Sequence, residues 1–318
     1  MKLDKFVLAI ICTIIIAYFV PQFGLETSVI PLEIISSIGI SLIFFFYGLK
    51  LNGEKLKEGL KNWKLHVLIQ LSTFLLFPLL VLLFYPFIQS EEASLLWLAV
   101  FFMAALPSTV SSSVVMVSMA KGNIPSAIFN ASISGIIGIA VTPLLVGFFT
   151  NNTSVNFDYS SVYLKLIIEI ILPVVLGISL QRFFGKYAYT YSKQLSTFDK
   201  SVILLIIYKS FAKSFHQKIF STVSAFDFMV LFIVVITLFF TVYYLIGYVS
   251  KKLDFSLEDR IAAQFCGTKK SLVHGTVFSK VLFGTSAVAG FMLLPIMLFH
   301  AIQILIISII ARKLGNRS

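Results

Sequence analysis

Charged residues are scarce in this sequence: Asp, Glu, Lys and Arg make up 12% of its 318 residues. A soluble domain of this length carries roughly a quarter. Hydrophobic residues instead make up 58% of the chain, and they fall in blocks of about 20, the length that a helix needs to cross ~30 Å of hydrocarbon. The composition therefore excludes a soluble globular domain and predicts an all-α integral membrane protein embedded in a lipid bilayer.

Cysteine is also rare, and Cys12 and Cys266 both fall inside apolar segments, so we expect neither a disulfide framework nor a cysteine metal site. The sequence has no His-Glu-x-x-His motif and no visible Ser-His-Asp arrangement. Although His274 follows Lys270 by one helical turn, we predict that the protein is not an enzyme and needs no organic cofactor. Its net charge of +11 comes from short loops rather than from one basic face, which argues against a nucleic-acid partner.

Ten apolar segments are present, and each is predicted to be one membrane-spanning helix. The first, residues 6–20, resembles a signal peptide but lacks a clear small-x-small cleavage site, so we interpret it as a retained helix. The others are residues 31–49, 63–85, 93–120, 124–149, 162–180, 201–215, 226–248, 261–283 and 287–311. Residues 1–149 and 162–311 then form two halves of five helices each.

The loop charges predict the orientation of these helices. Most lysines and arginines lie on one side of the spans, in the loops 50–64, 181–200 and 251–260 and near both chain ends. The other side is mainly acidic, with the exceptions Lys209, Lys213, Lys218 and Lys280. Because positive loops stay inside, both termini are expected in the cytoplasm, and the plasma (inner) membrane is the expected location.

A polar cluster interrupts the fourth segment, where an apolar run meets Pro107, Ser108, Thr109 and then Ser111, Ser112 and Ser113. Proline removes a backbone donor, and the hydroxyls that follow can bond the freed carbonyls or a ligand. A kinked helix whose serines bond their own backbone is the alternative interpretation. Five hydroxyls within six residues favour a functional site.

A second cluster interrupts the ninth segment at Thr268, Lys269, Lys270 and Ser271. Each lysine at the centre of a span costs on the order of 2.5–3.5 kcal/mol, so such residues normally face a cavity, a partner or a pathway. The alternative is that both side chains reach back to the cytoplasmic interface. Lys269 lies about half a span from Arg260, at roughly 1.5 Å per residue, which makes that route strained for Lys270.

Both interruptions fall in the fourth helix of a five-helix half, and an odd number of helices inverts the two halves in the membrane. Paired, interrupted spans in inverted halves predict the substrate site of a transporter. Half-helix N-termini attract anions there, and freed carbonyls suit cations. Asn130 and Ser134 share one face of the next helix and could point at the first break. For His300 and Gln303, ligand contact and interhelical contact are equally open.

Three stretches carry a resemblance to a known family: residues 44–51, the 107–113 break with the Lys121-Gly122-Asn123 turn after it, and residues 258–272. They resemble the bile acid:sodium symporter superfamily, and the last one resembles its SBF-like branch. The resemblance implies two inverted five-helix repeats, with the discontinuous fourth and ninth helices crossing at their breaks. It also implies a core domain of helices three to five and eight to ten, and a panel of helices one, two, six and seven.

In sodium-coupled members of the superfamily, the same region binds two sodium ions. The resemblance implies oxygen ligands from Ser112, Ser113, Asn130, Ser132 and Ser134. The ninth helix departs from that pattern, because Gln264 stands where those members have glutamate and Lys269 stands where an amide is expected. An ammonium group beside a hard cation site repels sodium. Lys269 could therefore replace a cation, titrate as a coupling group or hold an anionic substrate.

The resulting prediction is a secondary active transporter that moves a small organic anion by alternating access. The candidate binding residues are Ser111, Ser112, Ser113, Asn130, Ser132, Ser134, Gln264, Thr268, Lys269, Lys270 and Ser271. Sodium or a proton is the candidate coupling ion. The alternative is a regulatory membrane protein that affects calcium homeostasis without robust transport, as the resemblance to the SBF-like branch also implies; its cytoplasmic loop 50–64 would then contact a partner.

Overall fold

The computed structural model describes residues 5–25, 28, 31–51, 62–88, 90–109, 111–150, 164–218, 224–283 and 288–317. The regular structure in these ranges is helical, and no strand occurs among them. Most of the predicted loop 50–64 and of the polar connection after residue 150 lies outside the described residues.

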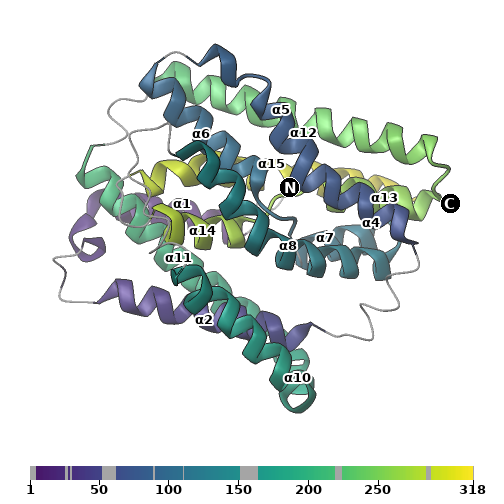
Figure 1. Ribbon diagram of the computed structural model, residues 1–318, viewed down its shortest axis with the longest axis horizontal. Helices are drawn as coiled ribbons and strands as arrows, with labels where there is room; N and C mark the ends of the chain where they lie inside the picture. Colours follow the sequence, from purple (N-terminus) through teal and green to yellow (C-terminus); the bar gives the residue numbers. More distant parts are fainter. Residues whose placement is uncertain are drawn as a thin grey trace. The chain divides into compact units, whose positions relative to one another are not determined.

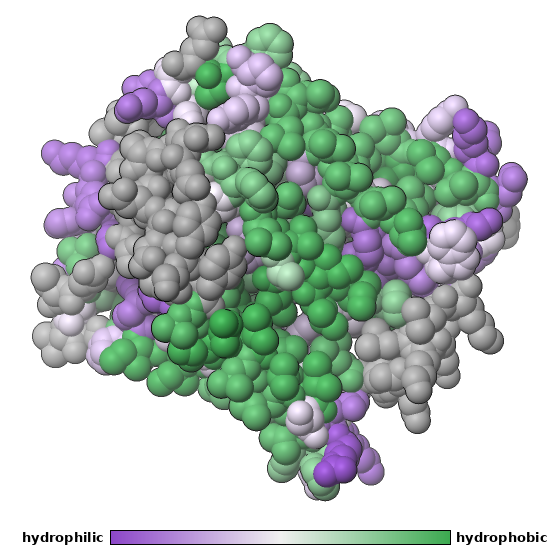
Figure 2. All heavy atoms as spheres, in the orientation of Figure 1, coloured by the Kyte–Doolittle hydropathy of each residue, from purple (hydrophilic) through white to green (hydrophobic). Residues whose placement is uncertain are grey.

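Six helical runs are long and apolar enough to cross a bilayer among the described residues. They are α2 (Leu32–Lys50), the run Trp63–Phe87, α8 (Ile124–Thr150), the run Leu164–Thr190, α12 (Ala225–Lys252) and α15 (Ala289–Gly315). Large hydrophobic side chains stay exposed along them, such as Leu79, Ile168 and Phe232, and Figure 2 shows hydrophobic residues over much of the visible surface. Apolar exposure on this scale suits contact with lipid rather than with water, so the protein is an integral membrane protein.

The helices on either side of the predicted loop 181–200 extend into it, so that prediction is wrong. α10 (Leu172–Thr190) and α11 (Ser192–His216) meet at Tyr191, and Arg182, Lys186 and Lys193 therefore lie on helices. Hydropathy marks the apolar part of a helix alone, whereas Lys, Arg and Gln are good helix formers in a polar setting.

The contacts within the chain divide it into two compact units. Unit 1 consists of Met1–Asn52, Val155–Val223 and Thr276–Leu293, and unit 2 consists of Gly53–Ser154, Ser224–Gly275 and Leu294–Ser318. Each unit is therefore assembled from three separate stretches of sequence.

Unit 1 contains α1 (Lys5–Phe19), η1 (Pro21–Gly24), α2, η5 (Ile167–Ile171), α10, α11 and the second part of α14 (Leu272–Phe283). α2 and α10 pack at very short range through two glycines, Gly48 and Gly177. A Cβ atom added to Gly48 would collide with the Val174 carbonyl oxygen, and one added to Gly177 would collide with that of Phe45. This small-residue contact allows the two backbones to approach as transmembrane helices do.

A cluster of opposite charges lies inside unit 1. Lys280 on α14 is 6% exposed, and its Nζ atom lies 3.2 Å from Glu33 and 3.4 Å from Glu169. The same ammonium group donates to the Ser37 hydroxyl, and Lys209 on α11 pairs with Glu33. Two of the lysines that departed from the predicted charge asymmetry are thus paired with carboxylates.

Unit 2 contains α4 (Trp63–Leu71), η3 (Ser72–Leu76), α5 (Phe77–Leu82), η4 (Tyr85–Phe87), α6 (Glu91–Ala105), α7 (Ser111–Met119), α8, α12, α13 (Leu257–Gly267), the first part of α14, and α15 from Leu294 onward. α7 and α8 form a tight hairpin (Figure 1). Its turn is fixed by Asp259 at the start of α13, whose carboxylate accepts hydrogen bonds of 2.7 Å from Asn123 and from Asn62. Arg317 donates to the carbonyls of Ala120 and Lys121 at the same turn.

Candidate functional site

The first interruption separates α6 from α7. Leu106 adopts an extended conformation after the last residue of α6, and Pro107 cannot supply a helical N–H group. The N–H group of Ser108 instead donates to the Ser134 hydroxyl of α8 at 2.9 Å. The chain therefore leaves the helix at a proline, and the neighbouring helix supplies a partner for the first backbone donor after it.

Leaving the helix frees the carbonyl groups of the last turn of α6, which need partners from elsewhere. The Ala105 carbonyl accepts a 2.8 Å hydrogen bond from the Thr142 hydroxyl. The carbonyls of Ala104 and Leu106 accept from the side chain of Lys270. Side chains from α8 and from the segment between α13 and α14 thus complete this helix end.

The second interruption separates α13 from α14 and contacts the first one directly. The Ser108 hydroxyl donates to the Cys266 carbonyl at 2.6 Å, and the Ser271 N–H group donates to the Pro107 carbonyl at 2.8 Å. Both hydrogen bonds join residues of unit 2 that lie far apart in the sequence. The two polar clusters predicted from the sequence therefore meet in the folded chain.

Lys270 is fully buried at this meeting point. Its Nζ atom donates to three carbonyl oxygens, those of Thr73 at 2.7 Å, Ala104 at 2.6 Å and Leu106 at 2.9 Å. The ring of Phe77 lies 4.3 Å from the same atom, within the range of a cation–π contact. We call these three oxygens and this ring the carbonyl cage.

The sequence around Thr73 explains why its carbonyl oxygen is available. In η3, the N–H group of Phe77 bonds to the carbonyl five residues earlier, that of Ser72, which is the pattern of a π-helix. The next donor in that pattern would come from residue 78 and would bond to Thr73. Residue 78 is a proline and has no N–H group, so the Thr73 oxygen is left for Lys270.

Gln303 on α15 holds the backbone of Lys270. Its Oε1 atom accepts from the Lys270 N–H group at 2.9 Å, and its Nε2 atom donates to the Lys270 carbonyl at 2.9 Å. The Nε2 atom also lies 3.1 Å from Nδ1 of His300. From the sequence, Gln303 is equally expected to contact a ligand or a neighbouring helix. The structure places it against the second interruption.

Lys269 is also fully buried, but its surroundings differ from those of Lys270. Its ammonium group donates to the Ser112 hydroxyl at 3.3 Å. The Thr109 hydroxyl lies 2.8 Å from that of Ser112 and 2.8 Å from that of Ser113. A chain of hydroxyl groups at the N-terminal end of α7 therefore leads to this ammonium group. Ser111 is the first residue of α7, and its side chain lies outside the described part.

The candidate residue Asn130 on α8 contacts α4. Its side-chain oxygen accepts from Gln70 at 3.1 Å, and its Nδ2 atom lies 2.7 Å from Nδ1 of His66. Ser132 is half-buried on the same helix. Sequence reasoning missed His66 and Gln70, because a lone His or Gln in an apolar helix carries no local signal of its partner.

The remaining candidates lie around the second interruption. Gln264 donates to the Tyr243 carbonyl of α12 at 3.2 Å, and Thr268 donates back to the Gln264 carbonyl. The Ser271 hydroxyl accepts from the N–H group of His274 at 3.3 Å, the contact of a residue that caps the start of a helix. Ser271 therefore stabilises the beginning of α14.

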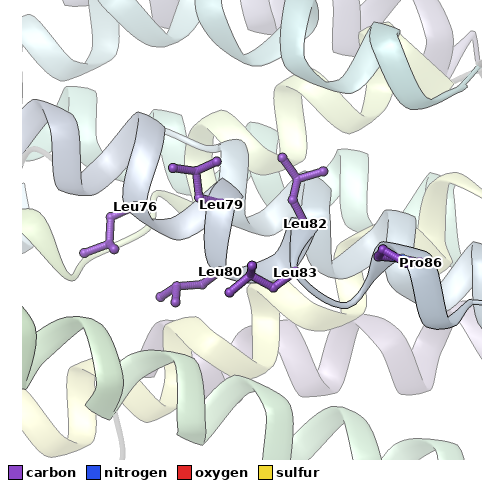
Figure 3. Close-up of a pocket in the computed structure, with 6 residues that line it drawn as sticks. All are labelled: Leu76, Leu79, Leu80, Leu82, Leu83 and Pro86. Atoms are coloured by element: carbon purple, nitrogen blue, oxygen red, sulfur yellow. The ribbon is translucent and has the colours of Figure 1, made fainter.

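An open groove of about 390 Å³ lies elsewhere in unit 2, along α5 and η4. Leu76, Leu79, Leu80, Leu82, Leu83 and Pro86 line it (Figure 3). A solute site needs a few polar groups that orient its ligand, and these six side chains supply none. The interruptions are therefore the stronger candidate for the functional site.

Apolar helices, two interruptions in contact and buried lysines together define a polytopic membrane protein of the kind that carries solutes. Comparison with known proteins gives the family. Residues 4–316 match the SBF-like CPA transporter family, and the chain belongs to that family of membrane transporters.

Individual relatives are similar over almost their whole length. An uncharacterized protein, PA2026, of Pseudomonas aeruginosa is 35% identical, over 99% of this chain and 93% of its own. The putative symporter YfeH of Escherichia coli is 33% identical, over 98% and 92%. Sodium/bile acid cotransporter 7 of Rattus norvegicus is 29% identical, over 96% and 91%. The predicted resemblance to the SBF-like branch is thus confirmed.

Proposed function

We propose that the protein is a secondary carrier of a small organic anion, which binds beside Lys269. The observation that carries this proposal is a fully buried ammonium group that donates to a hydroxyl, Ser112. A buried cation in a membrane protein is costly and marks a functional site unless it is neutralised. The carboxylate of a substrate would supply a negative charge beside Lys269.

The helix ends at the interruptions favour an anion as well. α7 begins at Ser111 and α14 begins at Leu272, so two half-helix N-termini are available to the site. Each carries a partial positive charge. The printed names of the relatives, a putative symporter and a sodium/bile acid cotransporter, support a small organic solute.

The proposed architecture has ten spans in two inverted repeats, residues 1–149 and 162–311, with both termini in the cytoplasm and the protein in the plasma membrane. α6 with α7 would form the discontinuous fourth span, and α13 with α14 the discontinuous ninth. Helices that are interrupted, short or charged fall outside the six long apolar runs. This accounts for the difference between six such runs and ten proposed spans. Unit 2 contains most of the proposed core and unit 1 contains the proposed panel, but Thr276–Leu293 of helices nine and ten belongs to unit 1. Alternating access is the proposed mechanism of transport.

Sodium is not expected to bind beside Lys269, where its charge would meet an ammonium group. Two of the sodium ligands suggested by the resemblance already make other contacts, Asn130 with Gln70 and Ser134 with Ser108. Gln264, which stands where sodium-coupled members have glutamate, contacts Tyr243. We therefore propose that the anion binds with the help of lysine rather than of sodium at this position. A proton remains the proposed coupling ion.

Thermal unfolding of the purified protein tests the proposal, with bile acids, other carboxylates and sulfonates each added in sodium and in choline buffer. At an anion concentration of about 100 times Kd, binding should stabilise the protein by about 2.7 kcal/mol. We expect one class of anion to stabilise the wild type and the exposed-site control Lys251→Gln equally, in both buffers. Lys269→Gln should lose that stabilisation and the matching uptake into vesicles.

Equal stabilisation of Lys269→Gln by the same anion, or saturable uptake that this variant leaves unchanged, would refute the proposed site. Stabilisation that requires sodium in the wild type would refute the proposal about sodium while leaving the anion site in place. The two parts of the proposal can therefore fail separately.

A further inference from the structure

We propose that the carbonyl cage around Lys270 is a binding site for a monovalent cation, and that the protein fills it permanently with its own ammonium group. The inference concerns the coupling ion of the carrier proposed above, and in that sense it rests on the proposed function. It separates the two adjacent lysines: Lys270 is a tethered cation, and Lys269 faces the substrate.

The hydrogen bonds of Lys270 match the donors of a charged amine. A neutral amine has two N–H donors, whereas an ammonium group has three. Nζ of Lys270 lies 2.6–2.9 Å from three carbonyl oxygens, and a carbonyl oxygen can only accept. Three acceptor oxygens match the three donors of the protonated group, and we take the cage to hold a positive charge.

The oxygens of the cage come from backbone that the fold has opened at two places. The Ala104 and Leu106 oxygens belong to the C-terminal end of α6, which carries a partial negative charge. The Thr73 oxygen is released by the π-helical turn before Pro78, and the Phe77 ring adds its negative face. Freed carbonyls at broken helices are the groups that coordinate small cations in transporters.

Lys270 is poorly suited to hold a substrate. Its three donors are used by the cage, and Gln303 makes hydrogen bonds to both its N–H and its carbonyl group. The neighbouring Lys269 donates to a hydroxyl rather than to a carbonyl cage. Adjacent positions in one sequence motif therefore serve two different electrostatic purposes.

Removing the Lys270 side chain should convert the carbonyl cage into a site for a free cation. Lys270→Ala deletes the ammonium group and leaves the oxygens, whereas Lys270→Met deletes the charge but keeps the volume filled. Both variants and the control Lys269→Ala are purified, and their thermal unfolding is followed in sodium, potassium, ammonium, methylammonium or choline chloride at one ionic strength. No organic anion is added, so the result does not depend on substrate binding.

We expect Lys270→Ala to unfold at a lower temperature than the wild type in choline and to recover by roughly 2–4 °C in at least one small cation. The wild type, Lys270→Met and Lys269→Ala should show no such preference over choline. If Lys270→Ala yields folded protein only when a small cation is present, that outcome supports the site as well.

Three results would overturn the inference. The first is a response of Lys270→Ala that is the same in every salt, choline included. The second is an equal response in Lys269→Ala or Lys270→Met. The third is Lys270→Ala protein that fails to fold in all of these cations. In each case Lys269→Gln would still lose its stabilisation by the anion, so failure of this inference can be told apart from failure of the proposed function.

Discussion

Replacement of Gln303 by methionine tests how much its two hydrogen bonds to the Lys270 backbone contribute to stability. Gln303→Met keeps the length of the side chain but removes both hydrogen bonds to the Lys270 backbone, 2.9 Å each. Both residues have no exposed surface, so water cannot replace the lost partners. An orphaned buried backbone group costs about 1–3 kcal/mol, whereas hydrogen bonds within membranes average ~0.6 kcal/mol and reach ~1.7. We expect a loss of about 2–4 kcal/mol for the pair.

Equilibrium unfolding in mixed micelles would measure this loss against two reference variants. Thr142→Val removes one hydrogen bond, to the Ala105 carbonyl, and should cost about half as much as Gln303→Met. Gln217→Met changes the same residue type at an exposed helix end and should stay within ~0.5 kcal/mol of the wild type. If Gln303→Met were as stable as Gln217→Met, the two hydrogen bonds from Gln303 to the Lys270 backbone would contribute nothing to stability, and the reasoning would be refuted.

Two further predictions concern unit 1. Lys280→Met leaves Glu169, which is 12% exposed, without the Lys280 ammonium group, and should destabilise the protein by about 3 kcal/mol. In a double-mutant cycle, adding Glu169→Gln should recover part of that loss. Strictly additive losses would contradict this prediction. Burial raises the pKa of Asp199 to about 6, and the charge of Lys50 lowers it in part. The folded state therefore binds a proton more tightly than the unfolded state, so the unfolding temperature should rise as the pH falls from about 7 toward 5. Asp199→Asn should remove that rise, and an identical pH profile in the variant would disprove the assignment.

Sequence reasoning found both interruptions because their causes are local. Pro107 removes a donor from its own helix, and consecutive hydroxyls and lysines in an apolar run are visible without any knowledge of the fold. It failed for residues 181–200, where charged residues continue the helices beyond the apolar segment. It also placed Lys209 and Lys280 on the outer side of the membrane without their partners, because Glu33 and Glu169 come from other helices.

By itself, the sequence determined that this is a helical membrane protein with two polar breaks, since composition and hydropathy depend on neighbouring residues alone. The tertiary structure decided which groups surround each lysine. Nζ of Lys270 bonds to oxygens 197, 166 and 164 positions away, and Lys269 reaches a hydroxyl 157 positions away. Two adjacent, chemically identical side chains differ in their surroundings because folding places carbonyl oxygens around one and hydroxyl groups beside the other.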